Sequence, residues 1–197
     1  MIKSIAAVSL PRRAAMAFAV TLLLAVRLAV TPAAAQSADG SDGYSPVMVE
    51  LKARPTVALS GTAEWDDGMH AIVASIAKLR KQMNDAGLQP AGVPMAAFIE
   101  TDDKGFRYEA MIPLDAKPET APALSDGARI SDSPAGKTMK FEHRGTYDEI
   151  DTTYEAITAY LDEKGLEAQN LFVEEYLNLP KAPDEDGAQV DIYVFLK

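Results

Sequence analysis

The stretch Phe172-Val173-Glu174-Glu175-Tyr176 places a carboxylate in a segment typical of a β-strand, with an aromatic residue two positions to either side. Side chains alternate between the two faces of a strand, so Phe172, Glu174 and Tyr176 are predicted to point the same way. An acid enclosed by aromatic rings can bind an apolar cation, or it becomes a carboxyl group with a shifted pKa. The plain alternative is a solvated strand glutamate. Glu174 is therefore the first candidate for a ligand-contacting group.

Other aromatic residues are candidates for the wall of such a site. They are Tyr147 at a predicted helix start, Tyr193 in the last predicted strand, Tyr108 and Trp65. For Tyr108 and Trp65, core packing is the simpler interpretation. The chain shows no nucleophile beside a base and no glycine-rich phosphate loop, and His143 is expected to be a hydrogen-bonded structural residue. With two histidines and no cysteine, the sequence predicts neither a metal site nor a cofactor.

Two amphipathic helices must help to position these residues. The first has apolar residues on one face and is predicted to end at Gly87; its stripe is Met69, Ile72, Val73, Ile76, Leu79 and Met83. The second is predicted to end at Gly165, and its stripe is Ile150, Tyr154, Ile157 and Leu161. Tyr154 is assigned to packing or to the surface of this helix.

Strands are predicted around the helices. The expected ranges are 47–51 with a continuation at 56–59, then 95–100, 106–112, 137–142, 171–179 and 190–196, with a short extended piece near 128–130. In the last strand Val190, Ile192, Val194 and Leu196 form an aliphatic face. We expect helices to cover the aliphatic faces, which leaves the face of Glu174 and Tyr193 to line a cleft or an interface.

Both halves of the chain follow the same plan of strand, helix, Gly-Leu, strand, loop and strand. The repeats span about 46–114 and 128–197. The predicted fold is α+β, with duplicated βαββ units related by a pseudo-twofold axis, antiparallel sheets and two main helices around a central ligand cleft.

The first 35 residues resemble an export signal. They combine a basic start, an uncharged run at 14–26 and Ala33-Ala34-Ala35 before a predicted cleavage point at Gln36. The apolar run is shorter than the roughly 20 residues of a transmembrane helix, and an uncleaved membrane anchor is the alternative. Residues 36–45 are predicted to be a flexible linker and residues 46–197 the folded domain. The expected location is periplasmic or secreted.

The charge of the remaining chain limits its partners. The first 35 residues hold four of the 19 basic residues and none of the 29 acidic ones, so residues 36–197 carry 15 basic and 29 acidic residues, a net charge of −14. Such a surface repels phosphate backbones, which argues against nucleic-acid binding. It attracts cations at long range, although an excess of acid commonly serves solubility alone.

Several of these segments resemble the GyrI-like small-molecule-binding domain, the effector-binding module of multidrug-responsive bacterial activators. They are 141–147, the helix to Gly165-Leu166, Glu174-Glu175-Tyr176, Pro180 and 191–194. The resemblance is good over about 134–197 and weaker over 47–114. It implies a cleft for lipophilic, often cationic compounds, with the characteristic glutamate at Glu174 and the aromatic of a Gly-x-Tyr motif at Tyr147. Unlike those activators, this chain is expected to lack a DNA-binding domain.

Three functions remain open at this stage. The first is non-catalytic binding of a small lipophilic, possibly cationic molecule for sequestration or sensing outside the cytoplasm. The second is hydrolysis of a strained or electrophilic compound, in which Glu174 and Tyr147 activate water; the resemblance implies this activity for a subgroup of the family. The third is a protein-interaction module that uses the aromatic sheet face.

Overall fold

A computed structural model of the protein describes residues 46–179 and 182–197. The predicted signal segment (1–35) and linker (36–45) lie outside the described residues. Within the described part of the chain, no helix is long and apolar enough to cross a membrane.

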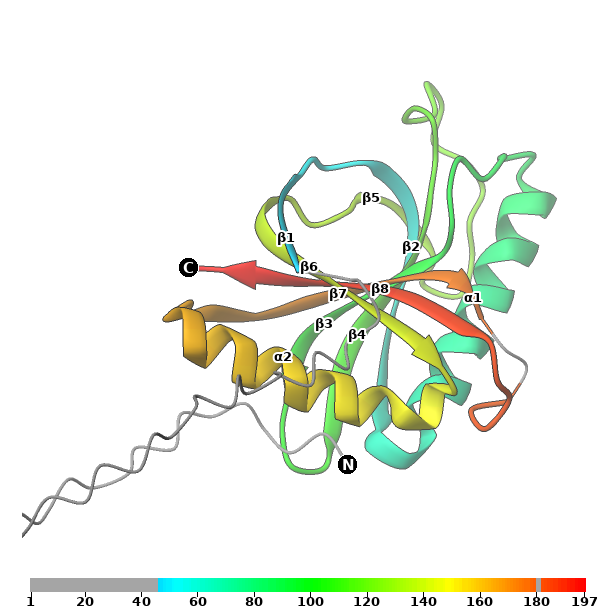
Figure 1. Cartoon of the computed structure of the whole chain (residues 1–197). Coiled ribbons are helices and arrows are strands. Elements are labelled where there is room, and N and C mark those ends of the chain that lie inside the picture. Colours follow the sequence, from blue (N-terminus) through cyan, green and yellow to red (C-terminus); the bar gives the residue numbers. More distant parts are fainter. Residues whose placement is uncertain (1–45, 180–181) are drawn as a thin grey trace, which may run out of the picture. The chain divides into compact units, whose positions relative to one another are not determined.

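The domain contains one antiparallel sheet of eight strands and two α-helices, each helix preceded by a short 3₁₀ turn (Figure 1). The predicted α+β fold class is confirmed, with a single sheet. The elements in chain order are β1 (Val47–Leu51), β2 (Pro55–Glu64), η1 (Trp65–Asp67), α1 (Gly68–Asp85), β3 (Met95–Thr101), β4 (Gly105–Pro113), β5 (Arg129–Asp132), β6 (Gly136–Gly145), η2 (Tyr147–Glu149), α2 (Ile150–Lys164), β7 (Ala168–Asn178) and β8 (Ala188–Leu196).

The helices form where the apolar stripes predict them. The buried apolar residues of α1 include Ile72, Ile76 and Leu79, and α2 buries its whole predicted stripe. The chain leaves α2 through Gly165, which has φ +63° in the left-handed region that glycine adopts without steric cost. Both helices therefore present one apolar face to the sheet, with α1 against β2 and β4 and α2 against β6.

The strand order is β1-β6-β8-β7-β3-β4-β2-β5. Read outward from the centre, equivalent strands of the two repeats follow in the same order, β3-β4-β2 on one side and β7-β8-β6 on the other. The central pair is β7 with β3, and each half continues through its last strand to its first long strand. The short strands are exchanged: β1 precedes β2 but pairs with β6, and β5 precedes β6 but pairs with β2. The prediction of one interrupted strand over 47–59 is wrong, because its two parts are separate strands six positions apart in the strand order.

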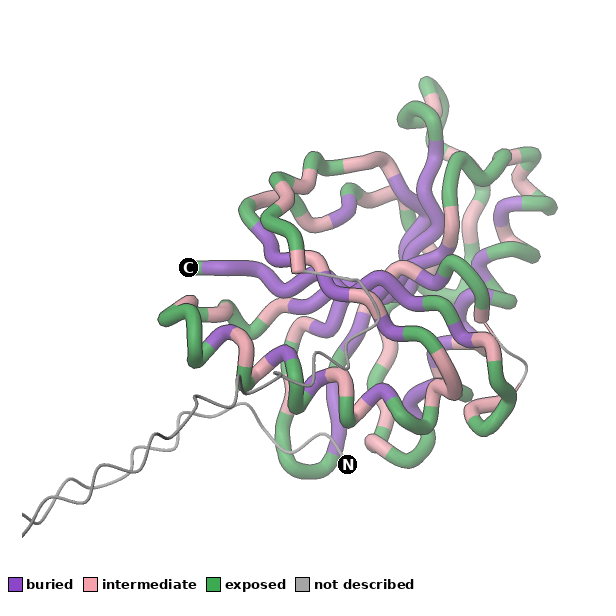
Figure 2. The backbone as a smooth tube through the Cα atoms, viewed as in Figure 1, coloured by how far each residue is buried: buried purple, intermediate pink, exposed green. Residues whose placement is uncertain are grey.

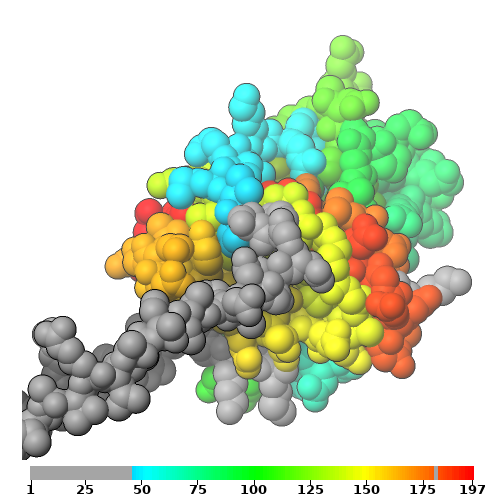
Figure 3. Space-filling model, viewed as in Figure 1, coloured from blue at the N-terminus to red at the C-terminus, as the bar shows by residue number. Residues whose placement is uncertain are grey.

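This exchange forces the sheet to curve. β1 and β2 are six strand positions apart, about 29 Å in a flat sheet with roughly 4.8 Å between strands. The connection at residues 52–54 can span only about 14 Å when fully extended. Residues 133–135 make the matching connection from β5 to β6, and the two meet, because the Arg54 carbonyl accepts the Ser133 N–H at 2.8 Å. In the space-filling view, the cyan residues of β1 and its connection to β2 lie on the surface beside yellow β6 (Figure 3).

The two faces of the sheet differ in composition. The helix-covered face carries the main core, including the aliphatic side of β8, which is buried along most of its length (Figure 2). The opposite face holds a smaller apolar cluster that includes Met95, Val173 and Phe195. Ion pairs surround this cluster, among them Arg54 with Glu175 and Lys140 with Asp191 (2.7 Å).

One predicted face assignment is wrong. Glu174 lies directly opposite Ile192 in the β7–β8 ladder, whereas Tyr193 lies opposite Val173. Residues directly opposite each other in an antiparallel pair share a face. The aromatic side of β7 therefore lies under the helices with the aliphatic side of β8, and Tyr193 lies on the other face.

Candidate functional site

Glu174 is buried at the centre of the sheet and is bound by three tyrosine hydroxyls. The residue is only 1% exposed. Oε2 accepts hydrogen bonds from the hydroxyls of Tyr147 (2.7 Å) and Tyr176 (2.9 Å), and Oε1 accepts one from Tyr154 (2.8 Å). A buried carboxylate needs such donors because desolvation otherwise disfavours its charge.

Each tyrosine comes from a different element. Tyr176 follows Glu174 by two residues on the same face of β7, and Tyr154 occupies the second position of the apolar stripe of α2. Tyr147 opens η2, just after β6 ends at Gly145, which has φ +135°. This turn therefore brings the Tyr147 hydroxyl within hydrogen-bonding distance of β7.

His143 fixes the turn that presents Tyr147. It is 3% exposed, and its ring nitrogens lie 2.8 Å from the Thr146 carbonyl oxygen and 2.8 Å from the Thr153 hydroxyl. The carbonyl can only accept, so Nε2 donates to it and Nδ1 accepts from Thr153. Burial lowers the pKa of His143, which keeps this ring neutral. The predicted structural role of His143 agrees with these contacts.

Burial controls the acid–base properties of the cluster. It raises the pKa of Glu174 above its ordinary value, and the hydrogen bonds from Tyr147, Tyr154 and Tyr176 act in the opposite direction. The pKa of each of the three tyrosines is raised well above the usual value, first by burial and then by the neighbouring Glu174 charge. The phenols therefore stay protonated and serve as hydrogen-bond donors.

Glu174 and Tyr147 open onto a cleft between the first turns of the two helices. The cleft has a volume of about 260 Å³. The residues that line it are Trp65, Asp66, Gly68, Met69, Phe98, Phe106, Tyr147, Asp148, Ile150, Asp151, Glu174 and Pro183. Its floor is the helix-covered face of β3, β4 and β7, and Trp65 is the only tryptophan of the chain.

The lining of the cleft is acidic as well as aromatic. Four carboxylate residues contribute to it (Asp66, Asp148, Asp151 and Glu174), and no lysine, arginine or histidine does so among the described residues. The two helix N-termini oppose this charge with about half a positive charge each. The four carboxylate residues outnumber these two partial charges.

The two halves of the fold contribute unequally to this cleft. Trp65 opens η1 as Tyr147 opens η2, and Ala96 pairs directly with Glu174 at the centre of the sheet. The second half thus supplies the acid and its hydroxyl donors. The first half supplies mainly rings: Phe106 lies 4.9 Å from Trp65 and 5.0 Å from Phe98 between ring centroids.

The model of one protein family, the GyrI-like small molecule binding domain, matches residues 44–197. The chain belongs to the GyrI-like family. Its function at this level is therefore small-molecule binding. A comparison with curated protein sequences finds no match.

Several solved structures have a similar fold. The C-terminal domain of EcmrR is 13% identical, with a TM-score of 0.64 over 79% of this chain and 99% of that one. A protein from Listeria innocua described as a hydrolase, encoded by lin2189, is 11% identical, with a TM-score of 0.54 over 77% and 91%. SAV2435 bound to tetraphenylphosphonium is 15% identical, with a TM-score of 0.51 over 78% and 94%. At these identities the likeness concerns the fold alone.

In this GyrI-like domain the predicted site residues form three groups: those at the cleft, one behind the Glu174 cluster, and two that lie away from the cleft. Glu174, Tyr147 and Trp65 line the cleft, and Tyr176 reaches it through its hydrogen bond to Glu174. Phe172 packs behind the cluster, edge-on to the Tyr154 ring at 6.0 Å between centroids.

Tyr108 and Tyr193 lie away from the cleft. The Tyr108 hydroxyl donates to the Ala71 carbonyl (3.0 Å) and lies 2.9 Å from the Ser75 hydroxyl, within the core beneath α1. The Tyr193 hydroxyl donates to Glu175 at 3.1 Å on the opposite face of the sheet.

Tyr154 is the member of the Glu174 cluster that was not predicted from the sequence. The available signal was a tyrosine inside an otherwise aliphatic helical stripe, because a buried hydroxyl needs a polar partner. The stripe itself did not identify that partner, which lies on a strand twenty residues away in the chain.

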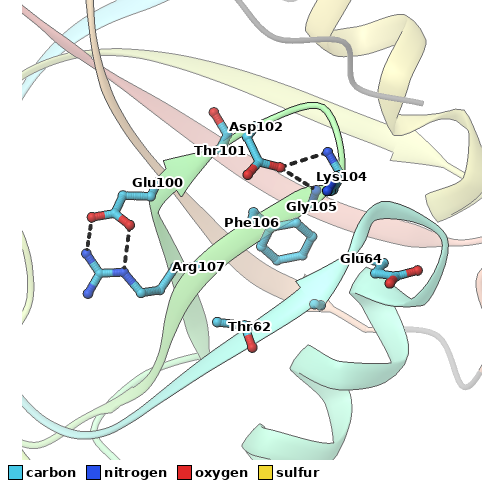
Figure 4. Close-up of a pocket in the computed structure, with 10 residues that line it drawn as sticks. Thr62, Glu64, Glu100, Thr101, Asp102, Lys104, Gly105, Phe106 and Arg107 are labelled. Carbon is cyan, nitrogen blue, oxygen red and sulfur yellow. Dashed lines mark hydrogen bonds and ion pairs between the residues drawn. The ribbon is translucent and has the colours of Figure 1, made fainter.

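A second, wider hollow of about 700 Å³ lies at the tip of the β3–β4 hairpin (Figure 4). There Glu100 pairs with Arg107, and the Asp102 carboxylate accepts the N–H groups of Lys104 (2.7 Å) and Gly105 (3.0 Å). These groups satisfy one another at the surface, and Glu100 has 67% of its side chain exposed. The smaller cleft is the better candidate because it alone of the two encloses a buried carboxylate.

A metal role for either hollow finds no support in the described residues, which contain no group of three or more potential metal ligands. The expectation that the protein works without a metal or cofactor stays a prediction.

Removal of the Tyr154 hydroxyl should raise the pKa of Glu174 further. The hydrogen bond from Tyr154 stabilises the ionised carboxylate, so Tyr154→Phe removes one of three opposing effects while burial remains. Carbon-detected NMR titration of the glutamate carboxyls in wild type and variant measures the shift. Tyr160→Phe, on the same helix, is the matched control, and an equal titration curve for Glu174 in Tyr154→Phe would contradict the assignment.

Proposed function

We propose that this domain binds small lipophilic cations, without chemical turnover, in the cleft between the first turns of α1 and α2, and that it does so outside the cytoplasm. The observation that carries the proposal is the buried Glu174 carboxylate, which faces an aromatic cleft with three further acids in its lining. Sequestration or sensing of such compounds would follow from binding alone.

The energetics of the cleft favour a cation with apolar substituents. Glu174 is removed from water, so an ion placed about 4 Å away gains roughly 4 kcal/mol at an effective dielectric constant of 20. Each ring face adds about 0.5–2 kcal/mol, and Trp65 and Tyr147 are the rings at the wall. A bound cation also favours the ionised form of Glu174, which opposes the rise in its pKa caused by burial.

The similarity to SAV2435, whose structure holds tetraphenylphosphonium, supports the same class of ligand. The likeness concerns the fold, so the support lies in the shared fold alone. A cleft of about 260 Å³ fits a ligand with one aromatic ring better than a larger one.

Benzyltrimethylammonium is expected to bind and to change the fluorescence of Trp65. Its uncharged carbon analogue, neopentylbenzene, should bind more weakly, because only the cation interacts favourably with Glu174. Glu174→Gln should weaken binding of the cation at least tenfold, since about 1.4 kcal/mol corresponds to a factor of ten. Fluorescence titration of the purified domain, with calorimetry as a second readout, measures these affinities.

Glu175→Gln is the matched control for this experiment. Glu175 is the next residue in β7, but it faces Arg54 and Tyr193 on the opposite side of the sheet. Equal affinities of wild type and Glu174→Gln, or equal affinities for the cation and its neutral analogue, would rule out cation binding at Glu174.

Hydrolysis of a strained or electrophilic compound is the second candidate. The raised pKa of Glu174 favours it, because a carboxyl group poised nearer neutrality is a better general acid or base, and Tyr147 lies beside it at the cleft. If the domain is such an enzyme, a cyclopropane-containing alkylating substrate should give a hydrolysed product, detectable by mass spectrometry, that Glu174→Gln fails to form. Unchanged substrate with wild-type protein would leave binding as the function.

We do not propose the third function, an interaction module. It required an exposed aromatic sheet face, whereas Phe172 is 6% exposed and Tyr176 is 2% exposed beneath the helices.

The proposed location rests on the basic, apolar and small-residue pattern of residues 1–35. Expression of the full chain in a Gram-negative host should yield a periplasmic form that begins at Gln36. N-terminal mass spectrometry of the periplasmic and membrane fractions tests this, and an intact chain in the membrane fraction would instead indicate an anchor.

A further inference from the structure

We infer that the tyrosines around Glu174 make the cleft selective for cations without N–H donors, such as quaternary ammonium ions, over primary ammonium ions of similar shape, and that Tyr147 determines this selectivity. The inference rests on the proposed function and names the class of cation that the site takes.

The hydrogen bonds of Glu174 carry the argument. A carboxylate offers about four acceptor positions, two on each oxygen. Oε2 accepts from both Tyr147 and Tyr176, and Oε1 accepts from Tyr154. Both positions on Oε2 are therefore filled, and a single position remains on Oε1.

The oxygen with two donors is the one that the cleft-lining Tyr147 contacts. Tyr147 lines the cleft and donates to Oε2, whereas Tyr154, which donates to Oε1, is buried and does not line it. A ligand that approaches along the Tyr147 wall therefore meets negative charge without a free carboxylate acceptor. Only the phenol oxygen of Tyr147 is offered there, and it is a neutral and weaker acceptor than a carboxylate.

The neighbouring side chains of the wall do not replace that acceptor. Met69, Phe98, Phe106 and Ile150 are apolar, and the Trp65 indole is a donor that is already bonded to the Asp102 carbonyl at 2.9 Å. Asp66 and Asp148 also line the cleft, but both are exposed, so an ion pair with either is solvated and contributes little. Asp151, the remaining aspartate of the lining, is half-buried and already engaged in an interaction of its own.

A primary ammonium ion carries three N–H donors, which water satisfies in solution. Inside the cleft these donors lose water without gaining equivalent acceptors, and unmade hydrogen bonds of a charged group are costly. A quaternary ammonium ion has no donors to satisfy and still gains the Coulomb attraction and the ring contacts. The difference in affinity between the two ions therefore depends on the Tyr147 hydroxyl, which fills one acceptor position of Oε2.

The test compares benzyltrimethylammonium with benzylammonium, both cations at pH 7, by calorimetry on the purified domain. Tyr147→Phe frees one acceptor position on Oε2 and keeps the ring. It should reduce the preference for the quaternary ion about tenfold, mainly through tighter binding of benzylammonium. Tyr176→Phe removes the other donor to the same oxygen and should shift the preference in the same direction, which provides a second variant if Tyr147→Phe fails to fold.

Tyr193→Phe is the matched control, because Tyr193 also donates to a glutamate of β7, Glu175, but on the opposite face of the sheet. The Tyr193→Phe variant should prefer the quaternary ion to the same extent as wild type. An unchanged preference in both Tyr147→Phe and Tyr176→Phe, or an equal loss of both ligands, would overturn the inference while cation binding stands. If wild type binds neither ion, the inference and the proposed function fall together.

Discussion

The burial of one carboxylate is the constraint on which the site depends. Glu174 lies at the centre of an eight-stranded sheet, where an uncompensated charge would be strongly disfavoured, and three tyrosine hydroxyls compensate it. Those hydroxyls come from η2, α2 and β7, so one acid ties the second helix and its leading turn to the central strand. His143, held neutral by burial, supports this arrangement from the end of β6 through its bonds to Thr146 and Thr153.

The compensation is incomplete, because the pKa of Glu174 remains raised. A carboxyl group whose pKa is higher in the folded than in the unfolded chain adds stability below its unfolded value. It loses that stability as the pH rises through the folded value. The ionised site therefore lowers the stability of the fold, and the surrounding core, with Ile192 and Val190 fully buried, must offset that cost. Such a cost is typical of binding sites, where function and stability make different demands on the same residue.

The duplicated architecture places the acid where a ligand can reach it. Exchange of β1 and β5 between the halves bends the sheet, and the two helices begin close together over its central strands. The halves then diverge in chemistry: Ala96 occupies the position across from Glu174, and rings such as Phe98 and Trp65 line the first half. The result is a cleft with an acidic end and an aromatic end.

The sequence by itself determined the helices, nearly all the strands, the repeated plan and the candidacy of Glu174, because these follow from local periodicity, glycine stops and alternation along one strand. The pairing of Tyr147 with Glu174 was implied by the family resemblance. The family resemblance seen in the sequence is confirmed by the GyrI-like family model, which matches residues 44–197. Only the tertiary structure decided which face each strand turns to the helices. It moved Tyr193 to the opposite face, separated β1 from β2, and brought Tyr154 from an apolar helical stripe to Glu174. Periodicity shows that two faces differ, but the pairing of distant strands and the need to satisfy a buried charge decide which one faces inward.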